Sequence, residues 1–133
     1  MLAVDTSVVV RLLTQDDRTQ AVQANSIFAI ESVWIAKTVL LETEWILRSC
    51  YGFSAENVRG ALALLLGLPN VRVEDEAAVT QAHALMSKGI DFSDGLHLAS
   101  RPPGSAFFSF DEKFARRAKR AGVTGVTTAS SAS

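Results

Sequence analysis

A chain of 133 residues with 48% hydrophobic and 20% charged residues has the size and composition of one compact globular domain, which excludes a disordered polymer. Its net charge of −1 excludes simple electrostatic attraction of the whole chain to nucleic acid, although residues 101–133 carry a net +4 and residues 1–100 a net −5. Because no apolar run approaches the roughly 20 residues that span a bilayer and no secretory signal is evident, we expect a cytoplasmic protein without membrane contact.

The first half of the chain alternates short apolar runs with helical patterns. The run 2–4 predicts a strand that ends at Asp5, and a helical pattern begins at Val8. Asp16 or Asp17 is expected to cap a helix that reaches Ile30. The patterns that follow predict a strand over 33–36 and helices over 38–50 and 55–66, the last capped by Ser54. We expect Cys50, the single cysteine, to be a small buried core residue.

The second half continues the alternation. A strand is predicted over 71–73, and the acidic residues 74–76 are expected in the first turn of a helix that reaches Ser87, where the helix dipole favours acids. A helix over 92–100, a loop at 102–104, a strand over 106–110 and a helix from Asp111 to Arg120 follow. We expect a short strand over 123–126, a single domain over 1–126 and a frayed tail over 127–133.

Strands that alternate with helices predict a three-layer α/β/α sandwich with a central, mainly parallel sheet. In such sheets ligands bind beyond the carboxyl ends of the strands. Asp5 and Asp111 each end a predicted strand, and we therefore expect both at one edge of the sheet. Either residue also suits the N-cap of the helix that follows it, so a purely structural role stays open for both.

Carboxylates that converge in a folded protein repel one another and therefore indicate a bound cation. Oxygen ligands without a cysteine cluster favour hard ions such as Mg²⁺ or Mn²⁺ over zinc. Such ions activate water and stabilise the charge of a transferred phosphate. Scattered acidic residues of this kind predict a metal-dependent site that cleaves phosphodiester bonds.

Glu42 and Glu44 lie on a predicted helix that is apolar on nearly all sides, so burial of both is expected. Arg48 follows Glu44 by four residues, in the favourable order for a helical ion pair, and accounts for that carboxylate. Glu42 has no such neighbour on its helix. It is therefore the better candidate for a metal or catalytic ligand.

Asp91 and Asp94 stand three residues apart at the start of a predicted helix. Asp91 is expected to cap this helix and to lend charge to the site as a secondary residue, whereas Asp94 is the better ligand candidate. His97 lies one turn beyond Asp94. A lone helical histidine is usually packed and hydrogen-bonded, and no catalytic role is predicted for it.

The last predicted helix carries a basic face made by Lys113, Arg116, Arg117 and Arg120. A solvated surface explains such a face as well as a function does. Next to a phosphodiester site, the same cations would hold a nucleic-acid backbone.

Four segments in this order, DTSVVVRLL, VLLETEWIL, DFSDGLHLA and FFSFDEKFARRA, resemble the PIN-domain family, specifically its VapC-like ribonuclease toxins. The resemblance spans almost the whole chain. It places Asp5, Glu42, Asp94 and Asp111 on the acidic quartet of the family. Thr6 or Ser7 falls on its small polar position.

By this resemblance the chain is a hydrolase, a Mg²⁺- or Mn²⁺-dependent endoribonuclease that cleaves RNA with a metal-activated water held by the quartet. The resemblance also implies a type II toxin-antitoxin system, in which a cognate antitoxin protein inhibits the toxin. The apolar helices between residues 38 and 66 would offer surfaces for a homodimer or for an antitoxin helix. The loop RPPGS is more proline-rich than expected for the family, and Ser109 keeps a hydroxyl where the family often has threonine.

Two other functions remain open from the sequence. A non-catalytic PIN-like module would bind RNA or a protein and use its acids only for folding. A DNA-directed, structure-specific nuclease would share the chemistry, but we expect it to need further elements that grip a DNA junction.

Overall fold

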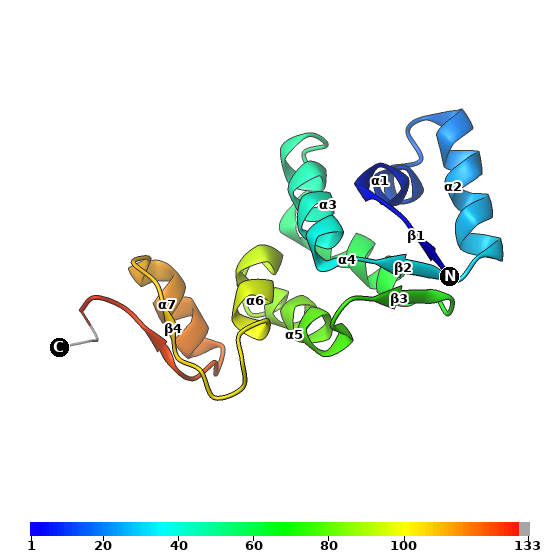
Figure 1. Ribbon diagram of the computed structural model, residues 1–133. Coiled ribbons are helices and arrows are strands. Elements are labelled where there is room, and N and C mark those ends of the chain that lie inside the picture. The colour runs from blue at the N-terminus through cyan, green and yellow to red at the C-terminus, as the bar shows by residue number, and fades with distance from the viewer. Residues whose placement is uncertain (131–133) are drawn as a thin grey trace. The chain divides into compact units, whose positions relative to one another are not determined.

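The computed structural model describes residues 1–130 (Figure 1). The chain divides into two compact units, Met1–Val79 and Thr80–Ser133, which are described separately. Helices and parallel strands alternate along the chain, and the fold is an α/β sandwich as predicted. Within residues 1–130, no helix is both long enough and apolar enough to cross a membrane.

The first unit contains a three-stranded parallel sheet in the order β1-β2-β3. Helices α1 and α2 connect β1 to β2, and α3 and α4 connect β2 to β3 (Figure 1). Parallel strands require such crossovers, because each chain segment must return to the starting edge before the next strand begins. The bounds of the elements are β1 (Leu2–Ala3), α1 (Thr6–Thr14), α2 (Arg18–Ile30), β2 (Val33–Ile35), α3 (Lys37–Ser49), α4 (Ala55–Leu66) and β3 (Val71–Val73).

The core of the first unit lies where α1 packs against α2 and α3 and where α4 packs against α3 and β3. Side chains that recur at helical spacing, such as Leu40 and Leu47 on α3, are fully buried. Val33 and Ile35 of β2 are buried too, as expected for the central strand of a parallel sheet. Ser54 caps α4 by accepting a hydrogen bond from the Asn57 amide at 3.1 Å, as predicted.

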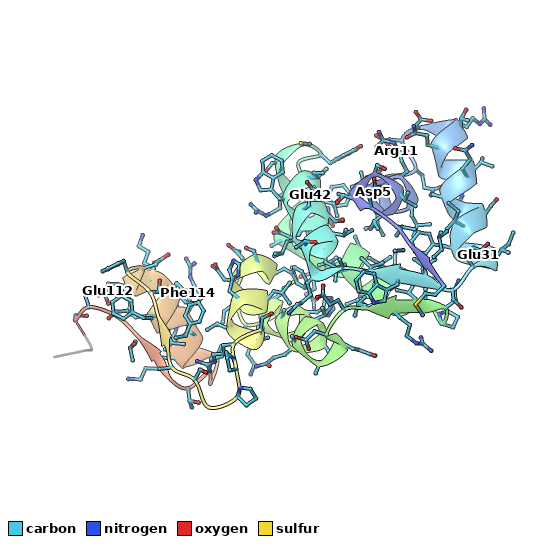
Figure 2. All side chains as sticks on the ribbon, in the orientation of Figure 1. Asp5, Arg11, Glu31, Glu42, Glu112 and Phe114 are labelled. Atoms are coloured by element: carbon cyan, nitrogen blue, oxygen red, sulfur yellow. The ribbon has the colours of Figure 1, made fainter. Side chains whose placement is uncertain are left out.

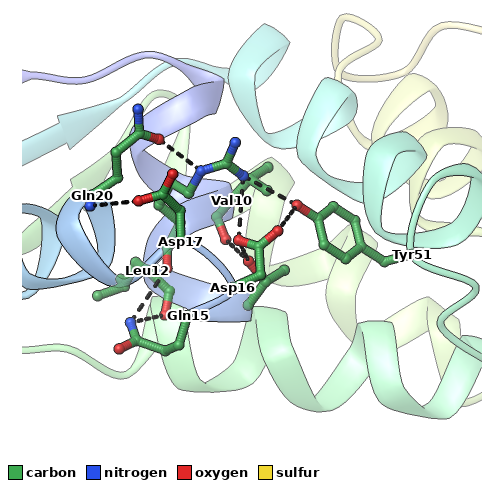
Figure 3. A network of polar contacts seen from close by, with 9 residues as sticks. Val10, Leu12, Gln15, Asp16, Asp17, Gln20 and Tyr51 are labelled. Atoms are coloured by element: carbon green, nitrogen blue, oxygen red, sulfur yellow. Dashed lines mark hydrogen bonds and ion pairs between the residues drawn. The ribbon is translucent and has the colours of Figure 1, made fainter.

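A polar network joins the end of α1 to the start of α2 and to Tyr51 after α3 (Figure 3). The Arg11 guanidinium donates to Gln20 at 2.7 Å, to Asp16 at 3.3 Å and to the Tyr51 hydroxyl at 3.1 Å. Tyr51 in turn donates to Asp16 at 2.5 Å, and this bond is the main reason why the pKa of Asp16 lies below its ordinary value. Asp17, rather than Asp16, caps α2.

The second unit contains a two-stranded parallel sheet, formed by β4 and β5. Its core joins Leu85, Ile90, Leu98, Phe114 and Ala118, and the rings of Phe107 and Phe114 lie 5.9 Å apart. The unit boundary falls within α5 (Glu76–Met86), and the elements that follow are α6 (Phe92–Ala99), β4 (Phe107–Phe108), α7 (Glu112–Arg120) and β5 (Val126–Thr127).

A close approach of two helices positions α6 in the second unit. A Cβ added at Gly95 would lie 3.2 Å from both Cα and the carbonyl oxygen of Ala82 on α5. These are backbone atoms, so a side chain at this position would have to push the two helices apart by a few tenths of an ångström, and glycine avoids this. Gly95 directly follows Asp94, and the contact therefore sets where the Asp94 carboxylate lies in this unit.

Several local predictions need correction. The helix α5 begins at Glu76, so Glu74 and Asp75 precede it instead of lying in its first turn. Both carboxylates bind Lys37: its amide donates to Glu74 at 2.9 Å, and its ammonium lies 3.1 Å from Asp75. Cys50 is exposed and is not a core residue, because it follows the last turn of α3 rather than lying on its buried face.

Residues 127–130, which were expected to belong to a frayed tail, form regular contacts. Thr127 pairs with Phe108 in β5, Thr128 is buried, and Ser130 donates to Glu112 at 2.9 Å. The remaining part of the predicted tail, residues 131–133, lies outside the described residues. The expected position of Asp5 and Asp111 at one edge of a single sheet is wrong, because Asp5 follows a strand of one sheet and Asp111 a strand of the other.

Candidate functional site

Asp5 lies between β1 and α1 and caps the helix, with Oδ1 as the acceptor. The Ser7 hydroxyl donates to Oδ1 at 2.6 Å, and the amides of Ser7 and Val8 donate at 3.1 and 3.4 Å. These bonds, that of the Ser7 hydroxyl above all, hold the pKa of Asp5 below its ordinary value because they favour the ionised form. Within residues 1–130 no hydrogen bond reaches Oδ2. This exposed oxygen is therefore available to a ligand.

Glu42 on α3 lies beside the start of α1, and the Thr6 hydroxyl donates a hydrogen bond to its Oε1 (Figure 2). Thr6 is only 7% exposed, so its hydroxyl is fixed by packing. Because Thr6 and Asp5 are neighbours in the chain, this bond brings Glu42 next to Asp5. The two carboxylates of the first unit thus share one surface, and each is oriented by a hydroxyl from the Asp5-Thr6-Ser7 turn.

The expected burial of Glu42 is wrong, whereas the assignment of Glu44 is confirmed. Glu44 is 2% exposed and lies 2.5 Å from Arg48, which is the ion pair that the spacing predicts. Glu42 is exposed and has Thr6 as its partner. Glu42 therefore remains a candidate ligand because it lies beside Asp5, and not because burial of an unpaired carboxylate would be costly.

Asp94 lies in the first turn of α6 in the second unit and forms no hydrogen bond within the described residues. Its partial burial raises the pKa of the carboxyl above the ordinary value, and the negative charges of Asp91 and Asp111 raise it further. His97 and Arg117 oppose this shift. Asp91 and Asp111 of the second unit therefore lie close enough to Asp94 to disfavour its ionised form, and His97 and Arg117 offset only part of the combined effect of burial and negative charge.

Asp91 occupies the N-cap position of α6, but its side chain makes no capping hydrogen bond, and the predicted capping role is wrong. Its carboxylate instead acts on Asp94. Asp111 caps α7 by accepting from the Phe114 amide at 3.0 Å. The Asp111 amide donates to the Ser109 hydroxyl at 3.0 Å, so the hydroxyl at position 109 helps to hold the turn that presents Asp111.

Helix α7 presents an exposed basic surface made by Lys113, Arg116, Arg117, Lys119 and Arg120, here called the α7 basic surface. Within residues 1–130 none of these side chains forms an ion pair. Arg116 and Lys119 line a cavity of about 580 Å³ between α7 and the segment around β5. Lys119 was not among the residues predicted to bind RNA, although its spacing of three from Arg116 places both on one helix face.

The residues fit a hard divalent ion by their chemistry. The four predicted ligands are all carboxylates, two in each unit, and the raised pKa of Asp94 marks negative charge that a cation would offset. Within either unit, taken over residues 1–130, no three His, Cys, Asp or Glu side chains are grouped closely enough to hold an ion.

Comparison with family models matches the PIN domain over residues 2–120, which is most of the chain. No curated protein matches the sequence. PIN domains are generally nucleases, which are hydrolases, and generally use divalent metal ions. The matched range covers well over half of the sequence. The chain therefore belongs to the PIN-domain family.

Proposed function

We propose that this protein is a metal-dependent endoribonuclease, and that Asp5, Glu42, Asp94 and Asp111 form its active site. The observation that carries the proposal is the setting of Asp94 in a chain of a nuclease family: its carboxylate is partly buried, forms no hydrogen bond within the described residues and lies near Asp91 and Asp111. Acidic side chains that lie close together despite their mutual repulsion are typical of a site that binds a cation.

The four carboxylates would hold Mg²⁺ or Mn²⁺, which would activate water and neutralise charge on the scissile phosphate. The protein's own contribution is orientation. Ser7 and the amides at the start of α1 hold Oδ1 of Asp5, which leaves Oδ2 for a ligand. Thr6 holds Oε1 of Glu42 in the same way. Asp91 strengthens the negative potential around Asp94 without being a ligand itself.

The α7 basic surface would bind the RNA backbone. Its side chains extend into solvent and form no ion pair within the described residues, which leaves their charge available to phosphates. Lys113, Arg116, Arg117 and Arg120 are the predicted contacts, and Lys119 joins them through the cavity that it shares with Arg116. Such contacts position RNA without reading its sequence.

The decisive experiment measures cleavage of labelled RNA by the purified protein with Mg²⁺ or Mn²⁺ and with excess chelator. Asp94→Asn should lower the rate by about a thousandfold or more, since it removes one site carboxylate. Asp17→Asn is the matched control, because Asn caps a helix as well as Asp does and Asp17 belongs to no candidate site. Full activity of Asp94→Asn, or cleavage in chelator, would sink the proposed mechanism. Sequencing the RNA ends identifies the cleavage site.

We further propose that the protein is a VapC-like toxin, active in the cytoplasm as a homodimer and inhibited by a cognate antitoxin. Trp45 on α3 and Leu64 on α4 support a protein partner, since these large apolar side chains are 55% and 72% exposed. Induced expression of the wild-type chain should arrest growth, whereas Asp94→Asn should not. Equal arrest by both would contradict the toxin assignment. Sedimentation measures the oligomeric state.

A non-catalytic binding module is the second candidate, and one observation favours it. Asp5 and Asp111 both complete helix caps, so each has a structural reason to be present. Such a module would bind RNA without cleaving it at any concentration of metal ion. Cleavage that depends on Asp94, which caps nothing, would exclude it.

A further inference from the structure

A second cavity of the Thr80–Ser133 unit, of about 370 Å³, lies away from the side chains assigned above. Residues of α5, the segment after it and the turn that follows α7 line this cavity. The polar groups among them are Gln81, Lys88, Arg101 and Thr124, and no aspartate or glutamate is present. Two cations therefore face one cavity without a carboxylate to balance them.

Both cations bind only backbone carbonyl groups. The Lys88 ammonium donates to the carbonyl of Ala121 at 3.2 Å, and Nη2 of Arg101 donates to the carbonyl of Thr124 at 2.7 Å. Neither forms an ion pair within residues 1–130. Carbonyl groups orient the two side chains, but they do not neutralise them. The two positive charges are thus held in place on either side of the residue 121–124 turn.

Arg101 also has an unused donor. Its Nη1 atom is buried and has no hydrogen-bond partner. The backbone next to it is Gly125, with φ +79°, where an added Cβ would lie 3.4 Å from Nη1. Glycine therefore admits the guanidinium at this place. A buried charged donor without a protein acceptor is rare and is typical of a place where an ordered water or an ion supplies one.

We infer that Lys88 and Arg101 form a binding site for a phosphate group, either free inorganic phosphate or the terminal phosphate of a nucleic-acid strand. A phosphate with only one ester bond, or none, carries between one and two negative charges at neutral pH, which two cations can balance, and its oxygens accept from a guanidinium and an ammonium together. The inference rests on the charges and hydrogen-bond donors that line this cavity, and it does not depend on the proposed nuclease activity.

Titration of the isotope-labelled, full-length protein with inorganic phosphate tests the site by NMR, at constant ionic strength so that screening does not change. The amide signals of Gln81 and Ala84, which line this cavity and not the 580 Å³ one, should shift and saturate. Lys88→Gln and Arg101→Gln should each weaken the fitted affinity by about tenfold, since each removes a charge-assisted hydrogen bond. Arg72→Gln is the matched control, because Arg72 also donates to carbonyl groups, those of Pro69 and Val71, but lines neither this cavity nor the 580 Å³ one. It should bind phosphate like the wild type.

A further pair of titrations distinguishes free phosphate from the terminal phosphate of a strand. A short oligonucleotide with a 5′-phosphate should shift the same amides more tightly than the 5′-hydroxyl form if the site holds strand ends, whereas equal shifts assign it to free phosphate. The inference fails if phosphate shifts only amides of α7, or if Lys88→Gln binds as the wild type does. Because Lys88 is exposed, its variant keeps the test valid even if Arg101→Gln does not fold.

Discussion

Asp5 in the first unit and Asp94 in the second are carboxylates with opposite surroundings. Asp5 is exposed and accepts three hydrogen bonds from the turn that follows it, and its pKa lies below the ordinary value. Asp94 is partly buried, forms no hydrogen bond within the described residues and is repelled by Asp91 and Asp111, and its pKa lies above the ordinary value. The first unit therefore stabilises its carboxylate by itself, whereas the second leaves a charge that requires compensation.

The largest effect expected in the first unit separates the two glutamates of α3. Glu42→Gln should lower RNA cleavage by about a hundredfold or more, because it removes a proposed ligand, and should leave folding unchanged. Glu44→Gln should do the reverse: it loses the ion pair with Arg48, which costs about 1 kcal/mol of unfolding free energy, and keeps the cleavage rate. Rate assays and urea unfolding measure both. If Glu44→Gln alone lowered the rate, the roles of the two residues would be exchanged.

A glycine substitution tests how the second unit holds Asp94. Gly95→Ala places a methyl group 3.2 Å from backbone atoms of Ala82, and should cost about 1–3 kcal/mol of unfolding free energy. Gly60→Ala on α4 is the control, since a Cβ there meets nothing within 4 Å and should stabilise the helix by about 0.5–1 kcal/mol. Chemical unfolding of both variants shows whether each substitution lowers or raises the free energy of unfolding. Stabilisation by Gly95→Ala would mean that α5 and α6 are not held at this distance.

The repulsion around Asp94 predicts an unusual pH dependence. Because the folded state raises the pKa of Asp94 above its unfolded value, ionisation opposes folding, and this cost is present above the folded pKa and disappears as the pH falls below the unfolded pKa. In chelator at pH 7, Asp94→Asn should therefore melt at a higher temperature than the wild type, and the difference should vanish near pH 3. Added Mg²⁺ should narrow the difference by stabilising only the wild type. A lower melting temperature for Asp94→Asn at pH 7 would contradict the proposed repulsion.

The smallest expected effect concerns Asp5. Its lowered pKa contributes stability above the unfolded pKa, and this stability is lost as the pH falls through the folded pKa. Ser7→Ala removes the largest cause of the shift, so the pKa of Asp5, followed by carboxyl NMR, should rise towards its ordinary value. The cost in stability should stay below about 1 kcal/mol, since Asp5 is exposed. Ser26→Ala, whose hydroxyl bonds only to the Val22 carbonyl, should leave the Asp5 titration unchanged.

Most elements follow from local sequence patterns, because periodicity and caps act over a few residues. Ser54 caps α4, and the predicted pairing of Glu44 with Arg48 is present. The burial of α3 was predicted less well: Glu42 and Trp45 are exposed on a helix whose composition alone suggested burial on all sides. Which residues of an apolar helix face solvent depends on the neighbours that pack against it, and those neighbours come from distant parts of the chain.

The sequence by itself determined the α/β class and the basic character of α7, since both depend on residue types and on spacing along the chain, and its resemblance to a known family nominated the four candidate carboxylates. Only the tertiary structure revealed that Thr6 holds Glu42, that Asp91 acts on Asp94 instead of capping α6, and that Lys88 and Arg101 line one cavity. These relations join residues by distance in space, and electrostatic and hydrogen-bond energies depend on that distance and on burial, neither of which a linear pattern encodes.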